Sequence, residues 1–239
     1  MTKSISLLSG LAIALTFISC KKDKDPLSIP TIYDATGYTA NTSAETALRT
    51  GLANLSTEMK KGRTQGVAVD FGVLTQLYNA GSPSLASVTS AYYKSRIEGA
   101  GGWLDELAKA SGNDYKLGTP QGEGGYFSGY LLDENGLELG ESIEKGLFGA
   151  ACYNHAITLL QNGVTPALAD QLFCIFGAHP DFPNTDNATK ATNPDRFAAQ
   201  YAARRDKNEG AGVYSKMKTA LLKLQAGDNA GEENRTEPR

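Results

Sequence analysis

The sequence predicts an all-α fold, and two observations support this class. Apolar residues recur every three or four positions through most of the chain, and glycine- or proline-rich breaks separate these segments. We find no alternating apolar and polar pattern of useful length, which would indicate a strand, and no internal repeat. The 239 residues suffice for one sizeable domain, or two small ones, with a real core.

Residues 1–19 are predicted to be a lipoprotein signal peptide. Lys3 supplies a positive start, and the apolar run "ISLLSGLAIALTFIS" is too short for a stable membrane span. Ser19 directly before Cys20 matches a bacterial lipobox, so we expect cleavage there and acylation of Cys20, for example with palmitate. Each buried methylene of such an anchor contributes ~0.8 kcal/mol. An ordinary secretory signal with a chance cysteine is the alternative.

Domain boundaries follow from composition. Residues 20–30 carry the lipidated cysteine and a tether of mixed charge with two prolines, and residues 227–239 form a polar tail that we expect to be disordered. The helical domain therefore spans residues 31–226. We therefore expect a cell-envelope protein that is attached to a membrane through the anchor on Cys20. The outer membrane is the expected location, and either of its faces could carry the protein. The formal net charge is −3 and no basic patch is interleaved with aromatic residues, so no nucleic-acid partner is expected.

The first helix is predicted over residues 42–61. Thr42 or Ser43 suits its N-cap, and Glu45 falls in its first turn. Its apolar positions, at spacings of four, three and four, give one buried stripe of Leu48, Leu52, Leu55 and Met59. Similar patterns predict helices over 67–81, 84–98, 102–111, 135–163, 166–177, 195–209 and 214–227.

Glycines mark two features of the middle of the chain. Residues 112–129 hold six glycines and no helical stripe of apolar residues, so we expect a long loop. Such a loop could bind a ligand or act as a lid. The strand and helix that a phosphate-binding loop needs are not predicted around it. In the central helix, 135–163, glycine costs ~1 kcal/mol relative to alanine. Gly146 and Gly149 therefore predict that another backbone or a ligand approaches closely there.

Several stretches together resemble a known family. They are "YLLDENGLELGESIEKGLFGAACYNHA", "FGAHPDFP" and "DRFAAQYAARRDKN", and the run from Glu144 to Ala150 is the most specific. They resemble Bacteroides-type lipoproteins with an imelysin-like domain, over about residues 29 to 224. The resemblance implies an all-helical bundle with a link to iron or haem acquisition. Family members continue with further helices, so we expect a bundle that is incomplete at the C-terminus.

The imelysin metal signature, Gly-x-His-x-x-Glu on a helix, is not kept. After His155 the glutamate position holds Thr158, and after His179 it holds Phe182. Pro180 also prevents a helix interior beside His179. Neither histidine has a nucleophile motif nearby, so no catalytic residue is predicted.

Two groups of residues are candidate sites. Cys152 and His155 share a helix face, and with Cys174 and His179 they could bind zinc, while Asp181 could bind a hard cation with His179. Cys152 and Cys174 are expected at the same height on adjacent helices, so they could instead form a disulfide. Both cysteines could also be buried free thiols, with a hydrogen-bonded histidine in the core. The second group, Glu138, Glu141 and Glu144, forms an acidic row that could hold a cation or polar ligand, or face solvent.

These features together predict a cell-envelope lipoprotein that binds a ligand or partner without catalysis, and the resemblance adds a link to iron or haem acquisition. The resemblance also implies one alternative, a metallopeptidase-like, metal-dependent hydrolase. A second alternative is a docking subunit of an outer-membrane uptake complex with a transporter as partner. Iron, zinc and haem are the cofactors to consider.

Overall fold

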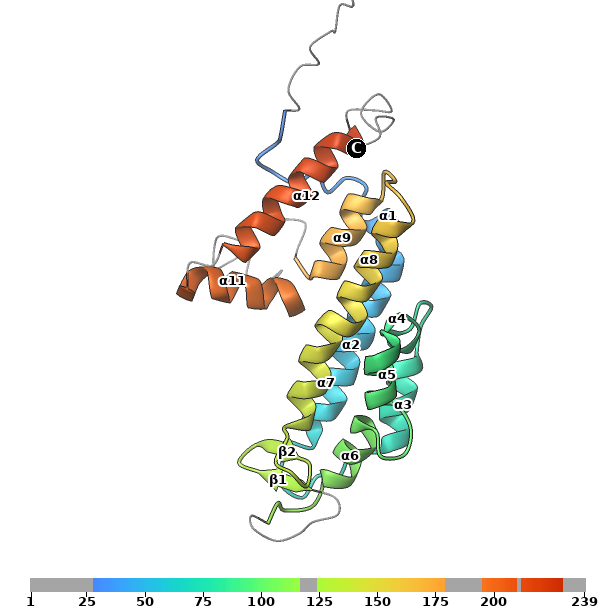
Figure 1. The fold of residues 1–239 in the computed structure, drawn as a ribbon, viewed down its shortest axis with the longest axis vertical. Coiled ribbons are helices and arrows are strands. Elements are labelled where there is room, and N and C mark those ends of the chain that lie inside the picture. The colour runs from blue at the N-terminus through green and yellow to red at the C-terminus, as the bar shows by residue number, and fades with distance from the viewer. Residues whose placement is uncertain (1–27, 117–123, 179–194, 210–211, 230–239) are drawn as a thin grey trace, which may run out of the picture.

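The computed structural model describes residues 28–116, 124–178, 195–209 and 212–229. These residues are mostly helical, with one two-stranded sheet, which confirms the all-α class at that level (Figure 1). The elements are α1 (Tyr38–Asn41), α2 (Ser43–Lys61), α3 (Phe71–Asn79), α4 (Leu85–Val88), α5 (Ala91–Ile97), α6 (Trp103–Ala110), β1 (Gly125–Phe127), β2 (Tyr130–Leu132), α7 (Leu139–Leu147), the π-helix η1 (Phe148–Tyr153), α8 (Asn154–Gln161), α9 (Leu168–Phe176), α11 (Phe197–Glu209) and α12 (Val213–Asn229). No helix among them is long and apolar enough to cross a membrane.

Helix α2 is the centre of the fold. It lies beside the rod that α7, η1 and α8 form, with α3 to α6 along one flank and α9, α11 and α12 gathered at the other end (Figure 1). The predicted stripe is confirmed, because its four apolar side chains are buried. The helix begins after Thr42, but the Thr42 hydroxyl donates to the Tyr38 carbonyl instead of capping α2. Glu45, in the first turn, is also buried.

The predicted central helix forms one continuous rod, but its middle turn is a π-helix. A close approach does exist at Gly146, but a side chain makes it and not the predicted backbone or ligand: a Cβ there would overlap the ring and hydroxyl of Tyr93. That hydroxyl donates to the Ser142 carbonyl, so the Tyr93 ring lies across this face of α7. At Gly149 no backbone among the described residues makes the predicted approach, since a Cβ there would meet none of their atoms within 4 Å.

The predicted glycine-rich loop needs correction, because its end is a β-hairpin. Strands β1 and β2 pair antiparallel with Phe127 opposite Tyr130, and Ser128 and Gly129 turn the chain with φ of 51° and 90°. Two positive φ values in a two-residue turn are typical of a tight hairpin. Strands of three residues are too short to show an alternating pattern, which explains why the sequence did not reveal them.

Three other boundaries differ from the predictions. The helix expected over 84–98 is two short helices, α4 and α5, with Thr89 and Ser90 between them in extended conformation. Helix α9 begins at Leu168, after Pro166, and ends at Gly177 in the left-handed conformation that favours glycine. Helix α12 continues to Asn229, beyond the predicted domain end.

Candidate functional site

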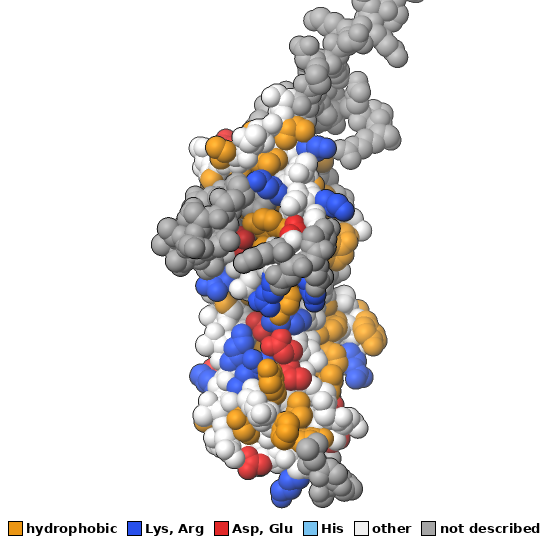
Figure 2. Space-filling model, turned by 90° about the vertical axis from the view of Figure 1, so that its left-hand side faces the viewer, with side chains coloured by type: hydrophobic (Ala, Val, Ile, Leu, Met, Phe, Trp, Pro, Cys, Tyr) orange, Lys and Arg blue, Asp and Glu red, His pale blue; other side chains and the backbone are white. Residues whose placement is uncertain are grey.

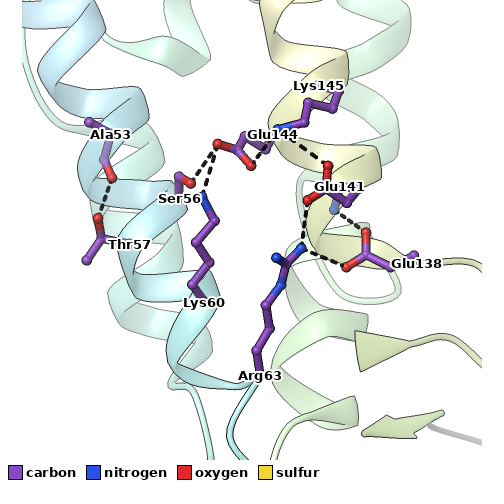
Figure 3. Close-up of polar contacts among 9 residues, drawn as sticks. All are labelled: Ala53, Ser56, Thr57, Lys60, Arg63, Glu138, Glu141, Glu144 and Lys145. Carbon is purple, nitrogen blue, oxygen red and sulfur yellow. Dashed lines mark hydrogen bonds and ion pairs between the residues drawn. The ribbon is translucent and has the colours of Figure 1, made fainter. Parts of the chain in front are cut away.

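The predicted acidic row runs from the N-cap of α7 into its second turn, and basic side chains from the end of α2 and the residues just after it meet the row (Figure 3). Glu138 is the N-cap of α7 and accepts from the Glu141 backbone. Arg63 donates to both glutamates, at 3.2 Å to Glu138 and 2.8 Å to Glu141. The row is therefore not a free set of carboxylates, because the protein's own cations already hold it.

Glu144 is the most enclosed member of the row. One carboxylate oxygen accepts from Ser56 at 2.9 Å and Lys60 at 3.3 Å, and the other accepts from Lys145 at 3.0 Å (Figure 3). Burial alone would raise the pKa of the Glu144 carboxyl. The hydrogen bonds from Lys145 and Ser56 and the two lysine charges outweigh burial, so the pKa is lowered. Glu144 is therefore a buried anion that fixes two lysines.

Glu138 and Glu141 respond differently to the same arginine. Burial is the largest influence on Glu138 and raises its pKa, despite the backbone hydrogen bond from Glu141 and the charge of Arg63. Burial also acts to raise the pKa of Glu141, but Arg63 and Lys145 together lower it. The directions of the three pKa shifts therefore depend on how far nearby cations and hydrogen bonds offset burial. Of the three glutamates, Glu144 also lines a large cleft.

That cleft, of about 700 Å³, lies between α2, the α7–η1 rod and the start of α11. Four basic side chains and one carboxylate line it, a net of three positive charges in a chain whose own net charge is −3. The ionised lining residues are Arg49, Lys60, Glu144, Lys145 and Arg196. Figure 2 shows basic and acidic side chains gathered in the middle of the face that α7 and α11 share.

Two of the four cations have no carboxylate partner within the described part of the chain. Arg49 donates to the Cys174 sulfur at 3.9 Å and lies near the Tyr38 side chain, and neither Arg49 nor Arg196 forms a side-chain ion pair with a described carboxylate. Arginine presents a planar fork of donors that matches carboxylate and phosphate groups. The arrangement is therefore able to bind an anion, with Lys60 and Lys145 held in place by Glu144.

Sequence reasoning missed this basic lining, although α2 carries a signal for it. Arg49, Ala53, Ser56 and Lys60 recur at spacings of four, three and four, which places them on one helix face beside the buried stripe. The other two cations, Lys145 and Arg196, come from distant segments, so only the fold shows that they face the same space.

Among the predicted metal ligands, His155 lies beside a glutamate that the sequence analysis did not include in the set. His155 Nε2 lies 3.0 Å from Glu45 Oε1, and both side chains are largely enclosed. Cys152 and Cys174 are buried free thiols, and the Cys174 sulfur lies 3.6 Å from the Thr46 hydroxyl. Within the described ranges, no three His, Cys, Asp or Glu side chains are placed to hold one metal ion. His179 and Asp181, and the lipidation site Cys20, lie outside the described residues.

The surroundings of Cys152 set its chemistry. The pKa of its thiol is raised to about 12, chiefly by burial; the charge of Arg49 opposes this rise and the nearby Cys174 adds to it. The thiolate is the reactive and metal-binding form of cysteine. At neutral pH, Cys152 is therefore a protonated, apolar member of the core.

Fold and site together define a mostly helical protein with one strongly cationic cleft. No protein-family model, curated protein or solved structure matches the chain.

Proposed function

We propose that the protein is a cell-envelope lipoprotein, anchored through Cys20, whose imelysin-like helical domain binds an anionic ligand and catalyses no reaction. The observation that carries the proposal is the cleft between α2 and α7, with a net of three positive charges among its lining residues. Its volume of about 700 Å³ falls within the range of small-molecule sites, roughly 300–1,000 Å³.

The two ends of the cleft differ in how free their cations are. Lys60 and Lys145 each share Glu144, which holds their ammonium groups in the wall and reduces their net charge. Arg49 and Arg196 are free of such pairing among the described residues. A carboxylate, sulfate or phosphate would therefore bind at the arginine end, with the lysines as secondary donors. Hydrogen bonds to charged groups contribute ~1.5–3 kcal/mol each.

The link to iron or haem acquisition is part of the proposal and comes from the sequence resemblance. Ferric chelates and haem commonly carry carboxylates, so an anionic site suits this class of ligand. Attachment to the outer membrane would place the domain where it could serve a transporter. For the metallopeptidase alternative, His155 has one carboxylate neighbour in the described structure, Glu45, while His179 lies outside the described residues.

Calorimetric titration with citrate at low ionic strength tests the proposal. The chain beginning at Lys21 retains every residue that the structure describes, and we expect it to bind citrate with a Kd below ~1 mM, equivalent to about −4 kcal/mol. Arg49→Gln should weaken binding about tenfold or more, the loss of one charge-assisted hydrogen bond.

The matched control is Lys61→Gln. Lys61 neighbours Lys60 on α2 and also pairs with a glutamate, Glu58, but it does not line the cleft. We expect its Kd to equal that of the unmodified chain. Absence of saturable citrate binding, or equal loss in both variants, would refute an anion site in this cleft.

A further inference from the structure

A second cavity, of about 290 Å³, lies between α8, α9 and the α11–α12 pair. Its lining is almost wholly apolar and includes Ile157, Leu160, Leu172, Phe176, Met217 and Leu224. Apolar side chains at its rim are open to solvent, with Tyr153 exposed at 65% and Leu160 at 50%. A concave apolar surface of this kind is typical of a ligand site.

The apolar cavity meets the cationic cleft at Phe148. This residue lines both spaces, and the adjacent pair Phe197 and Ala198 lines one space each. The Phe148 ring lies 5.5 Å from the ring of Phe197 and 6.0 Å from that of Tyr201. The charged lining of the cationic cleft and the apolar lining of the second cavity are therefore adjacent, with the Phe148 side chain shared between them.

A cationic side chain also lies at the junction of the two spaces, beside Phe148. Lys145 Nζ lies 5.2 Å from the centre of the Phe148 ring and 5.0 Å from that of Tyr201. On the apolar side, the π-helix η1 begins at Phe148 and supplies Cys152 and Tyr153 to the second cavity. Single turns of π-helix occur frequently at functional sites. The junction is thus built by the least regular turn of the central rod.

We propose that the ligand is a single-chain anionic amphiphile, with its head in the cationic cleft and its hydrocarbon tail in the apolar cavity beyond Phe148. This inference rests on the proposed function and specifies its ligand class. The positive charge of the cleft favours an anionic head group, and the volume of the apolar cavity limits the length of the tail. At ~30 Å³ for a group of about the size of water, 290 Å³ holds about ten groups, a chain of medium length.

The test compares three probes by calorimetry: butanoate, which is little more than a head; octanoate, which adds four methylenes; and octan-1-ol, which has the tail without the charge. A fully buried methylene raises affinity about fourfold, from ~0.8 kcal/mol. We expect octanoate to bind at least tenfold more tightly than butanoate and than octan-1-ol. This comparison needs no variant, so it does not depend on a substitution being tolerated.

Variants then locate the tail. Ala220 lines the apolar cavity and its neighbour Thr219 does not. Ala220→Trp should reduce octanoate affinity at least tenfold and leave butanoate unchanged, while Thr219→Trp should change neither. Arg49→Gln should weaken octanoate and butanoate by the same factor.

Three results would separate the possible failures. Equal binding of butanoate and octanoate, unaffected by Ala220→Trp, would overturn the amphiphile inference while the anion site stands. Equal binding of octanoate and octan-1-ol, unaffected by Arg49→Gln, would show an independent apolar site, open to another occupant such as the acyl chain on Cys20 or an apolar helix. If neither citrate nor either carboxylate binds, the proposed function itself fails.

Discussion

His155 Nε2 lies 3.0 Å from Oε1 of Glu45, a contact that joins α8 to the first turn of α2 across 110 positions of sequence. The Glu45 side chain is 1% exposed, and its other oxygen, Oε2, has no hydrogen-bond partner among the described residues. A buried carboxylate without a partner lowers the stability of a folded protein, so the contact with His155 offsets the free-energy cost of burying Glu45.

Loss of the histidine should therefore destabilise the domain. We expect His155→Ala to lower the free energy of unfolding by about 2–4 kcal/mol, because it leaves a buried carboxylate without its partner. Urea denaturation measures this change. Thr158→Ala, an exposed position on the same helix, is the control and should stay within about 0.5 kcal/mol.

A double-mutant cycle with Glu45→Ala identifies the cause. If the two side chains interact, the double variant should be less destabilised than the sum of the singles by about 1–3 kcal/mol. Additive effects would mean that each residue acts through other neighbours.

The two glycines of the central rod should respond oppositely to alanine. Gly146→Ala should cost about 1–3 kcal/mol, because the new Cβ would overlap Tyr93 in a packed interface. Gly149→Ala adds a methyl to open space and should be neutral or stabilising by up to about 1 kcal/mol. Thermal unfolding distinguishes them, since ~1 kcal/mol shifts Tm by about 2–4 °C in a domain of this size. Equal effects would contradict the Tyr93 contact.

The cysteines should be free and slow to react. Both are buried thiols, and burial raises the pKa of Cys152 to about 12. We expect two alkylated thiols per chain beginning at Lys21 when non-reduced protein is unfolded, and little alkylation in the folded protein at pH 8. Mass spectrometry counts the adducts. A mass lower by two hydrogens, with no adducts after unfolding, would instead show the Cys152–Cys174 disulfide.

Glu144 should give the domain a dependence on pH. Its folded pKa is lowered, so the stability it contributes is present above the unfolded value, ~4.3, and is lost as pH falls through the folded value. Glu144→Gln should cost about 1–2 kcal/mol at pH 7, and the difference from the unmodified chain should shrink below pH ~4. Denaturation at pH 7 and pH 3.5 measures it, with exposed Glu134→Gln as control. A difference that grows on acidification would have the wrong sign.

Helical periodicity was sufficient for much of the fold. The stripe from Leu48 to Met59 predicted α2 within about a residue, because a buried face repeats along one helix and is visible in the sequence. It could not reveal the hairpin at Ser128 and Gly129, whose strands are shorter than one recognisable period. Nor could it separate α4 from α5.

The candidate site was less accessible to sequence reasoning. The sequence shows Glu138, Glu141 and Glu144 as a row. Three of the row's partners, however, lie 75 or more positions away in or just after α2: Ser56, Lys60 and Arg63. Glu45 lies three residues before Leu48, the first residue of the buried stripe, and so shares its helix face. Only the fold shows that Glu45 contacts His155. Pairings between distant segments depend on how helices dock, and a pattern within one helix carries no record of that.

The most direct test of the anion-binding cleft is to map where an anion binds. Backbone amide spectra of isotope-labelled protein would be recorded during a citrate titration. We predict saturable shifts concentrated at residues 46–60, 144–148 and 196–200, and their loss in Arg49→Gln. Shifts confined to α3–α6, or no saturable shifts at all, would contradict the account.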